Sequence, residues 1–312
     1  LTCAHAIVKH LIAQKILIDG KKQPLFPGVF GIFGHGNVAC LGQALEENKD
    51  KIPTYRGHHE QNMALTGVAY SRAKRRKQIF IATSSVGPGS TNLLTAAAVA
   101  MSNRIPILFL PGDTYANRMP DPVLQQVEHF NNPGITANDA FKSVTRYFDR
   151  ITRPEQILQS LPQAIQLMID PADAGPACLS LCQDTQGETF DYPEEFFKER
   201  VHNIRRPKPD DFEIKKAAEK IKSCKNPIII SGGGVFYSDA MEELGNFAIK
   251  HNIPVTQTVM GYSTMKRDHS HFLGPIGGLG GKAANNFAKK TDLAIAVGTK
   301  LADFTTGSWA NF

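Results

Sequence analysis

Residues 79–100 read IFIATSSVGPGSTNLLTAAAVA and contain the unit from which the fold can be predicted. The first residues are apolar, as in a buried strand, and the last are rich in alanine, the strongest helix former. Two glycines around Pro88 predict a tight turn between them. The same order of short apolar run, turn and amphipathic segment recurs along the chain, which indicates parallel sheets with crossover helices.

The predicted elements fall into two series separated by a polar, proline-containing stretch. The first has strands over residues 29–33, 79–83, 105–110 and 176–181, and helices over 2–14, 38–47, 61–74, 90–103 and 154–169. The second has strands over 227–231, 254–259 and 292–298, and helices over 211–222, 239–251 and 282–289. We therefore predict an α/β protein with two doubly wound parallel-sheet domains, residues 1–185 and 210–312, joined by a linker over 186–209, with the second domain truncated at its C-terminus.

Composition excludes several classes of function. Lys plus Arg exceed Asp plus Glu by 35 − 29 = 6, but the densest basic run, residues 72–77, ends a predicted helix, where cations offset the helix dipole. We therefore expect no nucleic-acid partner. The sequence has no run of about 18 apolar residues, so no membrane span is predicted. The five cysteines are odd in number, scattered and without a C-x-x-C pair, which indicates a reduced, cytoplasmic protein.

A glycine-rich turn, GHGN at residues 34–37, follows the first predicted strand and opens a helix. With Ala39 it fits the G-x-G-x-x-A pattern of dinucleotide sites, but no acidic residue ends the next strand at the expected distance. A dinucleotide site, a plain tight turn and a loop for another ligand all stay open. His35 is the candidate functional residue, because open α/β sheets bind ligands at the carboxyl ends of their strands.

His58, His59 and Glu60 precede an apolar helix. A metal site is disfavoured, because adjacent side chains diverge and no further histidine or acid follows at helical spacing. A glutamate in the first turn of a helix is explained equally well by the helix dipole and by acid–base catalysis. The residues alone therefore leave capping and catalysis open for Glu60.

Three further glycine-containing segments are ambiguous. The turn over residues 83–92 can be a well-capped helix start or, because its residues are small, a surface that a planar ligand approaches closely. Residues 232–234 and 277–281 can permit tight strand-to-helix turns or hold a nucleotide. For these two segments we favour the turn and keep the nucleotide as an alternative.

The pair Gly112-Asp113 resembles the start of a metal motif that ends in asparagine. Asn131 and Asn132 follow at too short a spacing, so we predict no metal site. Residues 121–128 are predicted to form a loop and a short helix, in which Gln125 or Gln126 is free to hydrogen-bond a neighbour.

Taken in order, five segments resemble the thiamine diphosphate enzymes of the acetolactate synthase type: GHGN (34–37), HEQ (59–61), SVGPGSTN (85–92), PGD (111–113) and PIIISGGG (227–234). Four longer strings are similar to one branch of this family, which opens a cyclic dione in inositol breakdown: FGHGN (33–37), PDPVLQQVE (120–128), DRITRPEQ (149–156) and DFTTGSW (303–309). The resemblance covers essentially the whole chain. It implies a pyrimidine-binding domain, a Rossmann-like central domain, and hydrolysis of a C–C bond of a small-molecule substrate to give 5-deoxy-D-glucuronate.

The resemblance also implies roles for individual residues. In this family the glutamate of the HEQ motif, here Glu60, hydrogen-bonds the aminopyrimidine of the cofactor and favours the tautomer that removes the thiazolium C2 proton. The resemblance thus favours catalysis over capping for Glu60. The turn after the second strand is expected to contact the cofactor, and the loop after the first strand to contact substrate. The expected residues are Glu60, Ser84, Gly87, Pro88, Gly89 and Asn92 for the cofactor, His35, Asn37 and Gln126 for the substrate, and His35 beside Glu60 in catalysis.

The sequence departs from the family in one respect. The resemblance implies Mg²⁺ bound by a G-D-G motif in a third domain, and no G-D-G occurs in these residues. In the family the cofactor lies between two subunits, so we expect a second subunit in a homodimer or homotetramer. Thiamine diphosphate and Mg²⁺ are expected in the full-length enzyme, whereas the chain by itself is expected to be inactive and to hold no cofactor tightly.

Two alternative functions stay open. A carboligase such as acetolactate synthase would use the same Glu60 chemistry on another substrate. A non-catalytic module would instead bind a nucleotide through the second domain, since central domains of this superfamily can hold flavin or adenine nucleotide. The substrate accepted by the full-length enzyme distinguishes the first alternative, and a nucleotide released on denaturation distinguishes the second.

Overall fold

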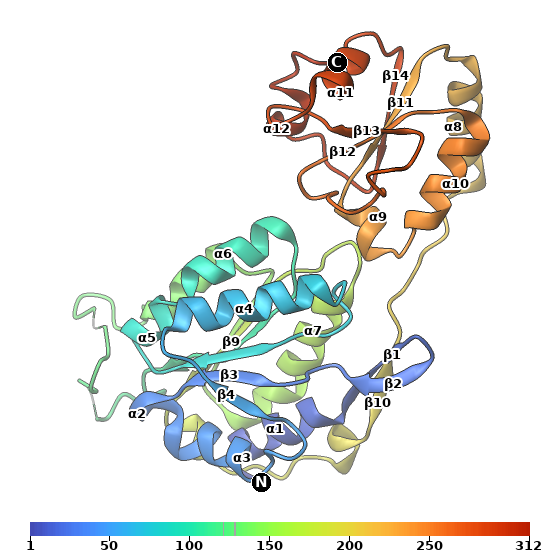
Figure 1. Cartoon of the computed structure of the whole chain (residues 1–312). Helices are drawn as coiled ribbons and strands as arrows, with labels where there is room; N and C mark the ends of the chain where they lie inside the picture. Colours follow the sequence, from blue (N-terminus) through green and yellow to red (C-terminus); the bar gives the residue numbers. More distant parts are fainter. Residues whose placement is uncertain (121, 128) are drawn as a thin grey trace. The chain divides into compact units, whose positions relative to one another are not determined.

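The computed structural model describes residues 1–120, 122–127 and 129–312. The chain divides into two compact units, unit 1 (Leu1–Arg206) and unit 2 (Pro207–Phe312) (Figure 1). Each unit contains a parallel sheet with helices packed against it, so the predicted α/β class is confirmed. Within the described ranges, none of the helices has the length and apolar character needed to span a lipid bilayer.

The main sheet of unit 1 has seven strands, and every pair in it is parallel. Its order is β4-β3-β5-β6-β9-β7, with β8 paired to β9. The strands are β3 (Val29–Ile32), β4 (Thr54–Arg56), β5 (Ile81–Ser84), β6 (Leu108–Phe109), β7 (Gly112–Asp113), β8 (Tyr147–Ile151) and β9 (Ala177–Cys182). From β3 the chain moves to β4 on one side and then returns to β5 on the other. The loops after β3 and β5 therefore meet at a topological switch point, where open α/β sheets bind ligands.

Helices cover both faces of this sheet (Figure 1). On one face α4 (Glu60–Ala73) packs with α6 (Leu94–Asn103), and on the other α1 (Cys3–Ala13) packs with α3 (Gln43–Glu46) and α7 (Ile157–Ile169). Shorter segments complete the unit: α2 (Gly34–Asn37), the π-helix η1 (Val38–Gly42), α5 (Pro88–Thr91), and the 3-10 helices η2 (Ala137–Ser143), η3 (Pro154–Gln156), η4 (Thr185–Gly187) and η5 (Glu194–Phe197).

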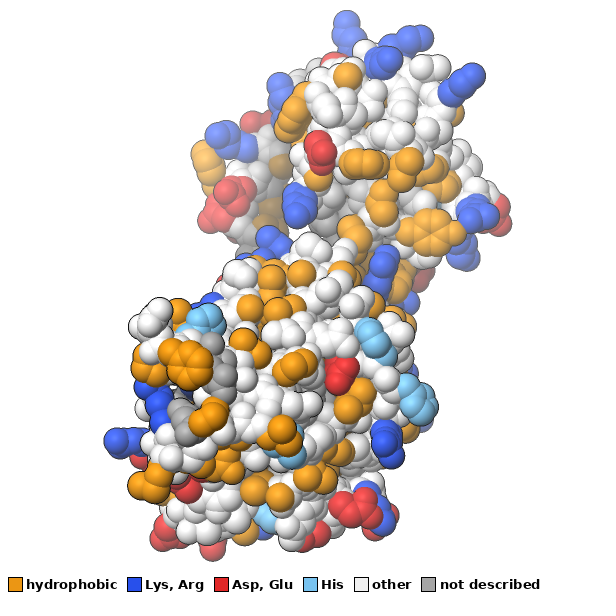
Figure 2. All heavy atoms as spheres, turned by 90° about the vertical axis from the view of Figure 1, so that its left-hand side faces the viewer, with side chains coloured by type: hydrophobic (Ala, Val, Ile, Leu, Met, Phe, Trp, Pro, Cys, Tyr) orange, Lys and Arg blue, Asp and Glu red, His pale blue; other side chains and the backbone are white. Residues whose placement is uncertain are grey.

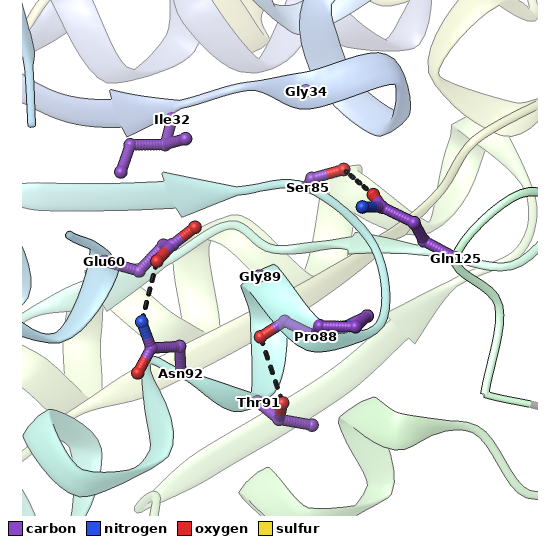
Figure 3. A pocket seen from close by; sticks show the side chains of 9 residues that line it. All are labelled: Ile32, Gly34, Glu60, Ser85, Pro88, Gly89, Thr91, Asn92 and Gln125. Atoms are coloured by element: carbon purple, nitrogen blue, oxygen red, sulfur yellow. Dashed lines mark hydrogen bonds between the residues drawn. The ribbon is translucent and has the colours of Figure 1, made fainter. Parts of the chain in front are cut away.

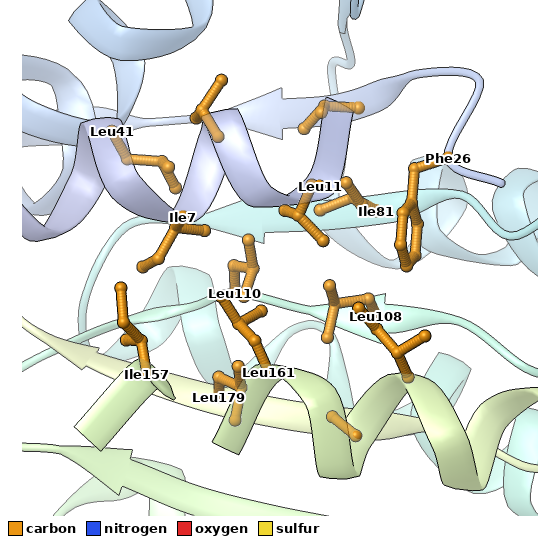
Figure 4. Close-up of a cluster of buried hydrophobic side chains, with 14 of the residues drawn as sticks. Ile7, Leu11, Phe26, Leu41, Ile81, Leu108, Leu110, Ile157, Leu161 and Leu179 are labelled. Atoms are coloured by element: carbon orange, nitrogen blue, oxygen red, sulfur yellow. The ribbon is translucent and has the colours of Figure 1, made fainter. Parts of the chain in front are cut away.

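A large hydrophobic core lies between the sheet and the helices α1 and α7 (Figure 4). Ile7 of α1 and Leu161 of α7 are fully buried against strand residues such as Ile81 and Leu179. Full burial of one such side chain stabilises the fold by about 1.5–3 kcal/mol. This packing makes the sheet a rigid base for the loops at its carboxyl edge.

Unit 1 also contains a three-stranded sheet that sequence patterns did not predict. β1 (Gln14–Ile18) pairs antiparallel with β2 (Lys21–Pro24) and parallel with β10 (Arg200–His202). β10 lies in the stretch 186–209 that was predicted to be a linker. Tyr192, in the same stretch, is buried in the core of unit 1 and donates to the carbonyl oxygen of Pro154 at 2.9 Å. Most of that stretch thus belongs to unit 1.

Two histidines tie this stretch to the rest of unit 1. His10 Nδ1 donates to the carbonyl oxygen of Phe196 at 2.7 Å, and the two rings stack with centroids 4.0 Å apart. His202 Nε2 donates to Gln14 Oε1 at 2.8 Å. Burial lowers the pKa of His10, and it lowers the pKa of His202 to about 4, where the charge of Arg200 adds to the effect.

Acidification is expected to destabilise unit 1 through these two rings. The ordinary pKa of both rings is 6.5, so the neutral rings contribute their full stability above about pH 6.5. This contribution is lost as the pH falls from there toward the lowered pKa that each ring has in the folded protein. The urea midpoint of unfolding should therefore fall between about pH 7 and about pH 5. His202→Gln, which cannot titrate, should show a smaller fall, and an equal fall in both proteins would contradict this assignment.

Unit 2 has a four-stranded parallel sheet in the order β13-β12-β11-β14. Alternate residues of β11 point to opposite faces, so that Ile229 and Ile228 lie in separate hydrophobic clusters. The strands are β11 (Pro227–Ser231), β12 (Val255–Gln257), β13 (Phe272–Pro275) and β14 (Leu293–Val297), and the helices are α8 (Asp211–Ser223), α9 (Gly233–Tyr237), α10 (Met241–His251), α11 (Lys282–Ala288) and α12 (Asp303–Thr306).

The glycine-rich turns of unit 2 use their backbone amides internally. The Gly232 amide donates to the carbonyl oxygen of Val297 at 2.9 Å, and the Gly234 amide to that of Gly298 at 2.8 Å. In the segment 277–281, the amides of the four glycines donate to acceptors in unit 2 at 2.7–2.9 Å. Amides that hold a phosphate must be free to donate to it. This geometry favours tight turns over nucleotide binding at both segments.

Candidate active site

A pocket of about 620 Å³ lies at the switch point of the unit 1 sheet (Figure 3). Its walls come from the ends of β3 and β5, the start of α4, the helix α5 and the segment between β7 and η2. The lining residues are Ile32, Gly34, Glu60, Ser85, Pro88, Gly89, Thr91, Asn92 and Gln125. Glu60 is the one ionisable side chain in this set, so the acid–base chemistry of the pocket depends on its carboxylate.

Glu60 is the first residue of α4, and its side chain turns toward Asn92 instead of capping the helix (Figure 3). The cap is His59, whose Nδ1 accepts from the backbone amide of Asn62 at 3.4 Å. Glu60 Oε2 accepts from Asn92 Nδ2 at 2.7 Å. Oε1 faces Gly89, on which an added Cβ would lie 3.5 Å away. Because Oε1 has no hydrogen-bond partner among the described residues, it is available to a ligand.

The turn after β5 brings Pro88, Gly89 and Asn92 to the pocket, and their contact with the cofactor stays a prediction. The helix predicted over 90–103 is interrupted: α5 begins with Pro88 at its first position, and α6 begins only at Leu94. Asn92 lies in the break, which lets its amide reach Glu60.

Two residues predicted to contact the cofactor lie outside the pocket lining. Ser84 ends β5 with its side chain fully buried, and its hydroxyl donates to the carbonyl oxygen of Ser85 at 3.2 Å. Gly87 is also buried. Ser85, one residue after the strand, lines the pocket instead. The cofactor contacts of Ser84 and Gly87 therefore stay predictions.

Gly87 supports the pocket through a close backbone contact. Its φ is +66°, and an added Cβ would lie 1.9 Å from the carbonyl oxygen of Gln125. Gly87→Ala is expected to lower the free energy of unfolding by about 1–3 kcal/mol, because both the positive φ and the overlap with the Gln125 carbonyl oxygen disfavour alanine. Gly20→Ala is the control, because Gly20 has a φ of +74° with no atom within 4 Å. Equal losses in urea unfolding would contradict the importance of the contact.

The residues predicted to contact substrate lie in different surroundings. His35 Nε2 donates to the carbonyl oxygen of Leu124 at 2.7 Å, so the ring links the loop after β3 to the segment that carries Gln125. Gln126 lines a second pocket of about 200 Å³, whereas Gln125 lines the first. Residues 121 and 128, which bound the predicted loop and short helix, lie outside the described residues.

Asn37 is fully buried and does not reach the pocket. Its Nδ2 donates to Thr83 Oγ1 at 2.7 Å and to the carbonyl oxygen of Ser84 at 2.9 Å, while its Oδ1 accepts from Gln186 Nε2 at 3.0 Å. The structure thus corrects the prediction of a substrate contact: Asn37 joins the carboxyl ends of the strands. Gln186 was missed, because its partner lies 149 residues away and no local pattern marks it.

The Gly112-Asp113 pair contributes to the fold through its carboxylate. Asp113 is buried, and its Oδ2 lies 2.8 Å from Arg150 Nε. Among the described residues, no group of three or more His, Cys, Asp or Glu side chains is arranged to hold a metal ion.

Comparison with known proteins bears directly on this pocket. Residues 14–132 match the model of the N-terminal TPP binding domain of thiamine pyrophosphate enzymes, and residues 214–312 match the model of their central domain. The chain belongs to the thiamine pyrophosphate enzymes. The family expected from the sequence is therefore confirmed. All the lining residues, from Ile32 to Gln125, lie within the match to the TPP binding domain of this family.

Curated members of the family match nearly the whole chain. A protein of Listeria monocytogenes serovar 1/2a is 49% identical over 312 residues, which are 100% of this chain and 49% of that protein. Proteins of Clostridium tetani and Geobacillus thermodenitrificans are 50% and 49% identical over 308 residues, 99% of this chain and 48% of each relative. All three are named 3D-(3,5/4)-trihydroxycyclohexane-1,2-dione hydrolase. The chain spans about half the length of these relatives.

Proposed function

We propose that the chain forms the N-terminal part of a thiamine diphosphate-dependent hydrolase that opens 3D-(3,5/4)-trihydroxycyclohexane-1,2-dione to 5-deoxy-D-glucuronate. The observation that supports this most is the Glu60 carboxylate, held by Asn92 at 2.7 Å in a pocket at the switch point of a TPP binding domain. The identity of 49% to hydrolases of that name, over the full length of the chain, supports the substrate.

The pocket fits the aminopyrimidine of thiamine diphosphate. Pro88 and Gly89 present little side-chain bulk, so a flat ring can approach the backbone, and Ile32 offers an apolar wall. Glu60 Oε1 is proposed to share a proton with a ring nitrogen, while the Asn92 amide keeps the carboxylate oriented through Oε2. When bound, the cofactor supplies a carbon nucleophile that also accepts electrons. The diphosphate and Mg²⁺ are proposed to bind the part of the relatives that lies outside this match.

The polyhydroxylated substrate is proposed to lie beside Gln125. The Gln125 side chain reaches the pocket, where its Oε1 accepts from Ser85 Oγ at 3.5 Å, and it can exchange this long hydrogen bond for one to a substrate hydroxyl. His35 is proposed to act through the Leu124 carbonyl that it holds, which positions Gln125. We therefore propose that His35 helps to position the residues that contact the substrate.

A second subunit is proposed to complete the site. Large apolar side chains are exposed in the segment that carries Gln125: Met119 is 90% exposed, Leu124 71% and Phe130 87%. Figure 2, which views unit 1 from the side of α2 and α5, shows hydrophobic side chains across this face. Exposed apolar patches of this kind mark interaction sites. A homodimer or homotetramer would cover them.

The substrate tests the proposed function. Full-length enzyme supplied with thiamine diphosphate and Mg²⁺ should turn over the cyclic dione and not pyruvate. Carboxylate formation can be followed by proton release, and pyruvate consumption in a separate assay. Rapid turnover of pyruvate with none of the dione would replace the proposed hydrolase by a carboligase.

The chain by itself is expected to bind thiamine diphosphate weakly, because its pocket provides partners for the pyrimidine but none of the proposed diphosphate and Mg²⁺ ligands. Titration calorimetry with and without Mg²⁺ should show no saturation at micromolar cofactor, whereas full-length enzyme should saturate. Tight, saturable binding to the chain alone would contradict the proposal that the other half of the site lies elsewhere.

A further inference from the structure

The Asp113 carboxylate is the centre of a buried polar network beneath the pocket. Asp113 is 1% exposed. Its Oδ1 accepts from the backbone amide of Thr114 at 2.8 Å. Its Oδ2 accepts from Thr136 Oγ1 at 3.1 Å, from Arg150 Nε at 2.8 Å and from Ser180 Oγ at 2.5 Å. Burial lowers the pKa of Arg150, but attraction and hydrogen bonding to Asp113 outweigh this and raise it, so the guanidinium stays charged beside the carboxylate.

One arm of this network holds the segment that carries Gln125. Thr114 and Thr136 flank that segment on either side in the chain, and both are bound to the Asp113 carboxylate. Arg150 Nη2 donates to Thr136 Oγ1 at 2.8 Å and strengthens this attachment. The far end of the segment, at Thr136, is therefore fixed to the Asp113 carboxylate, beside the residue where the segment begins.

The other arm reaches the turn that forms the opposite wall. Asn138 Nδ2 donates to Ser180 Oγ at 2.7 Å and to the carbonyl oxygen of Gly112 at 2.9 Å. Asn138 Oδ1 accepts from Ser90 Oγ. Ser90 is fully buried in α5, the short helix that presents Pro88 to the pocket. A continuous chain of hydrogen bonds thus runs from Asp113 through Ser180 and Asn138 to α5.

We propose that Asp113 is a positioning residue for the active site, whose buried carboxylate fixes both the Gln125 segment and the α5 turn and so sets the shape of the pocket. Each link in the chain is buried, and a hydrogen bond in such surroundings is stronger than one in water. The helix α5 has only four residues, and a helix this short is not stable in isolation. We therefore expect the hydrogen bond from Ser90 to Asn138 to contribute to the order of α5. The consequence for cofactor affinity rests on the proposed function, whereas the positioning itself does not.

Hydrogen exchange on the cofactor-free chain tests the positioning directly. The amides of Thr91 and Asn92 donate to the carbonyl oxygens of Gly87 and Pro88 at 2.9 and 3.1 Å, so they report the opening of α5. In Ser90→Ala these amides should exchange about tenfold faster than in wild type. Asp113→Asn should show the same increase, and Ser90→Ala, which leaves the ion pair intact, keeps the test valid if Asp113→Asn does not fold.

Tyr192→Phe is the matched control, since it also removes one buried hydroxyl hydrogen bond from unit 1 but touches no member of the network. It should leave exchange at residues 91 and 92 unchanged. Unaltered exchange in Ser90→Ala, or an equal increase in Tyr192→Phe, would overturn the proposal. In full-length enzyme, Ser90→Ala should also weaken thiamine diphosphate binding about tenfold. If wild-type enzyme binds no cofactor, the proposed function fails, while the exchange result still decides the positioning.

Discussion

Glu60→Gln in the full-length enzyme is expected to lower kcat by about 10²–10⁴-fold, the range that a positioned acid–base group contributes. Glutamine preserves the shape of the side chain, and its carbonyl oxygen can still accept from Asn92 Nδ2. It cannot carry the negative charge that the proposed proton sharing at Oε1 requires. The loss should therefore appear in turnover, with the fold and the pocket unchanged.

Glu242→Gln provides a matched control for this substitution. Glu242 lies in the first turn of α10 in unit 2, so the same change removes the same favourable interaction with a helix N-terminus, worth about 0.3–1 kcal/mol. It should leave kcat unchanged, and both variants should lose similar amounts of thermal stability. Wild-type turnover in Glu60→Gln would remove Glu60 from the mechanism.

The fold class could be predicted because its signals are local. The runs around Val29, Ile81 and Ile229 are short, apolar and followed by glycine, so each predicts a buried strand and a turn independently of the rest of the chain. The sheet formed by β1, β2 and β10 could not be predicted in this way. Gln14 of β1 pairs with Arg200 of β10, so the two strands are far apart in the sequence. β1 (Gln14–Ile18) also follows α1 directly, without an intervening turn signal.

The site was predicted in part for a related reason. The small residues and the glutamate could be assigned to a pocket, because the ends of parallel strands meet at one edge of the sheet. Which of two neighbours faces the pocket depends on backbone geometry that residue types do not reveal. Gln125 has a left-handed φ of +61°, and this residue, not Gln126, lines the first pocket. Likewise Ser84 still belongs to the fully buried strand β5, whereas Ser85 has left it.

Arg150→Met is expected to destabilise the chain by about 3–5 kcal/mol, the cost of leaving a buried charge without its partner. Arg150 also lies 2.9 Å from Asp139, so its loss deprives two carboxylates of a cation. The loss costs more at Asp113, because its side chain is 2% exposed and that of Asp139 is 20% exposed. Arg153→Met is the control: its pair with Glu155 is 3.9 Å long and its side chain is 76% exposed, so it should lose no more than about 1 kcal/mol.

The double variant Asp113→Asn/Arg150→Met separates the ion pair from the rest of the network. With both charges removed, no unpaired charge is buried, and the double variant should be less destabilised than the sum of the two single variants by about 0.5–3 kcal/mol. Urea unfolding of the four proteins measures this coupling. Additive losses, or a loss in Arg150→Met no larger than in Arg153→Met, would show that the ion pair is not what holds Asp113 in place. A different outcome is that the double variant regains stability while its α5 amides still exchange rapidly. In that case the Asp113 charge is needed for the shape of the pocket more than for the stability of the fold.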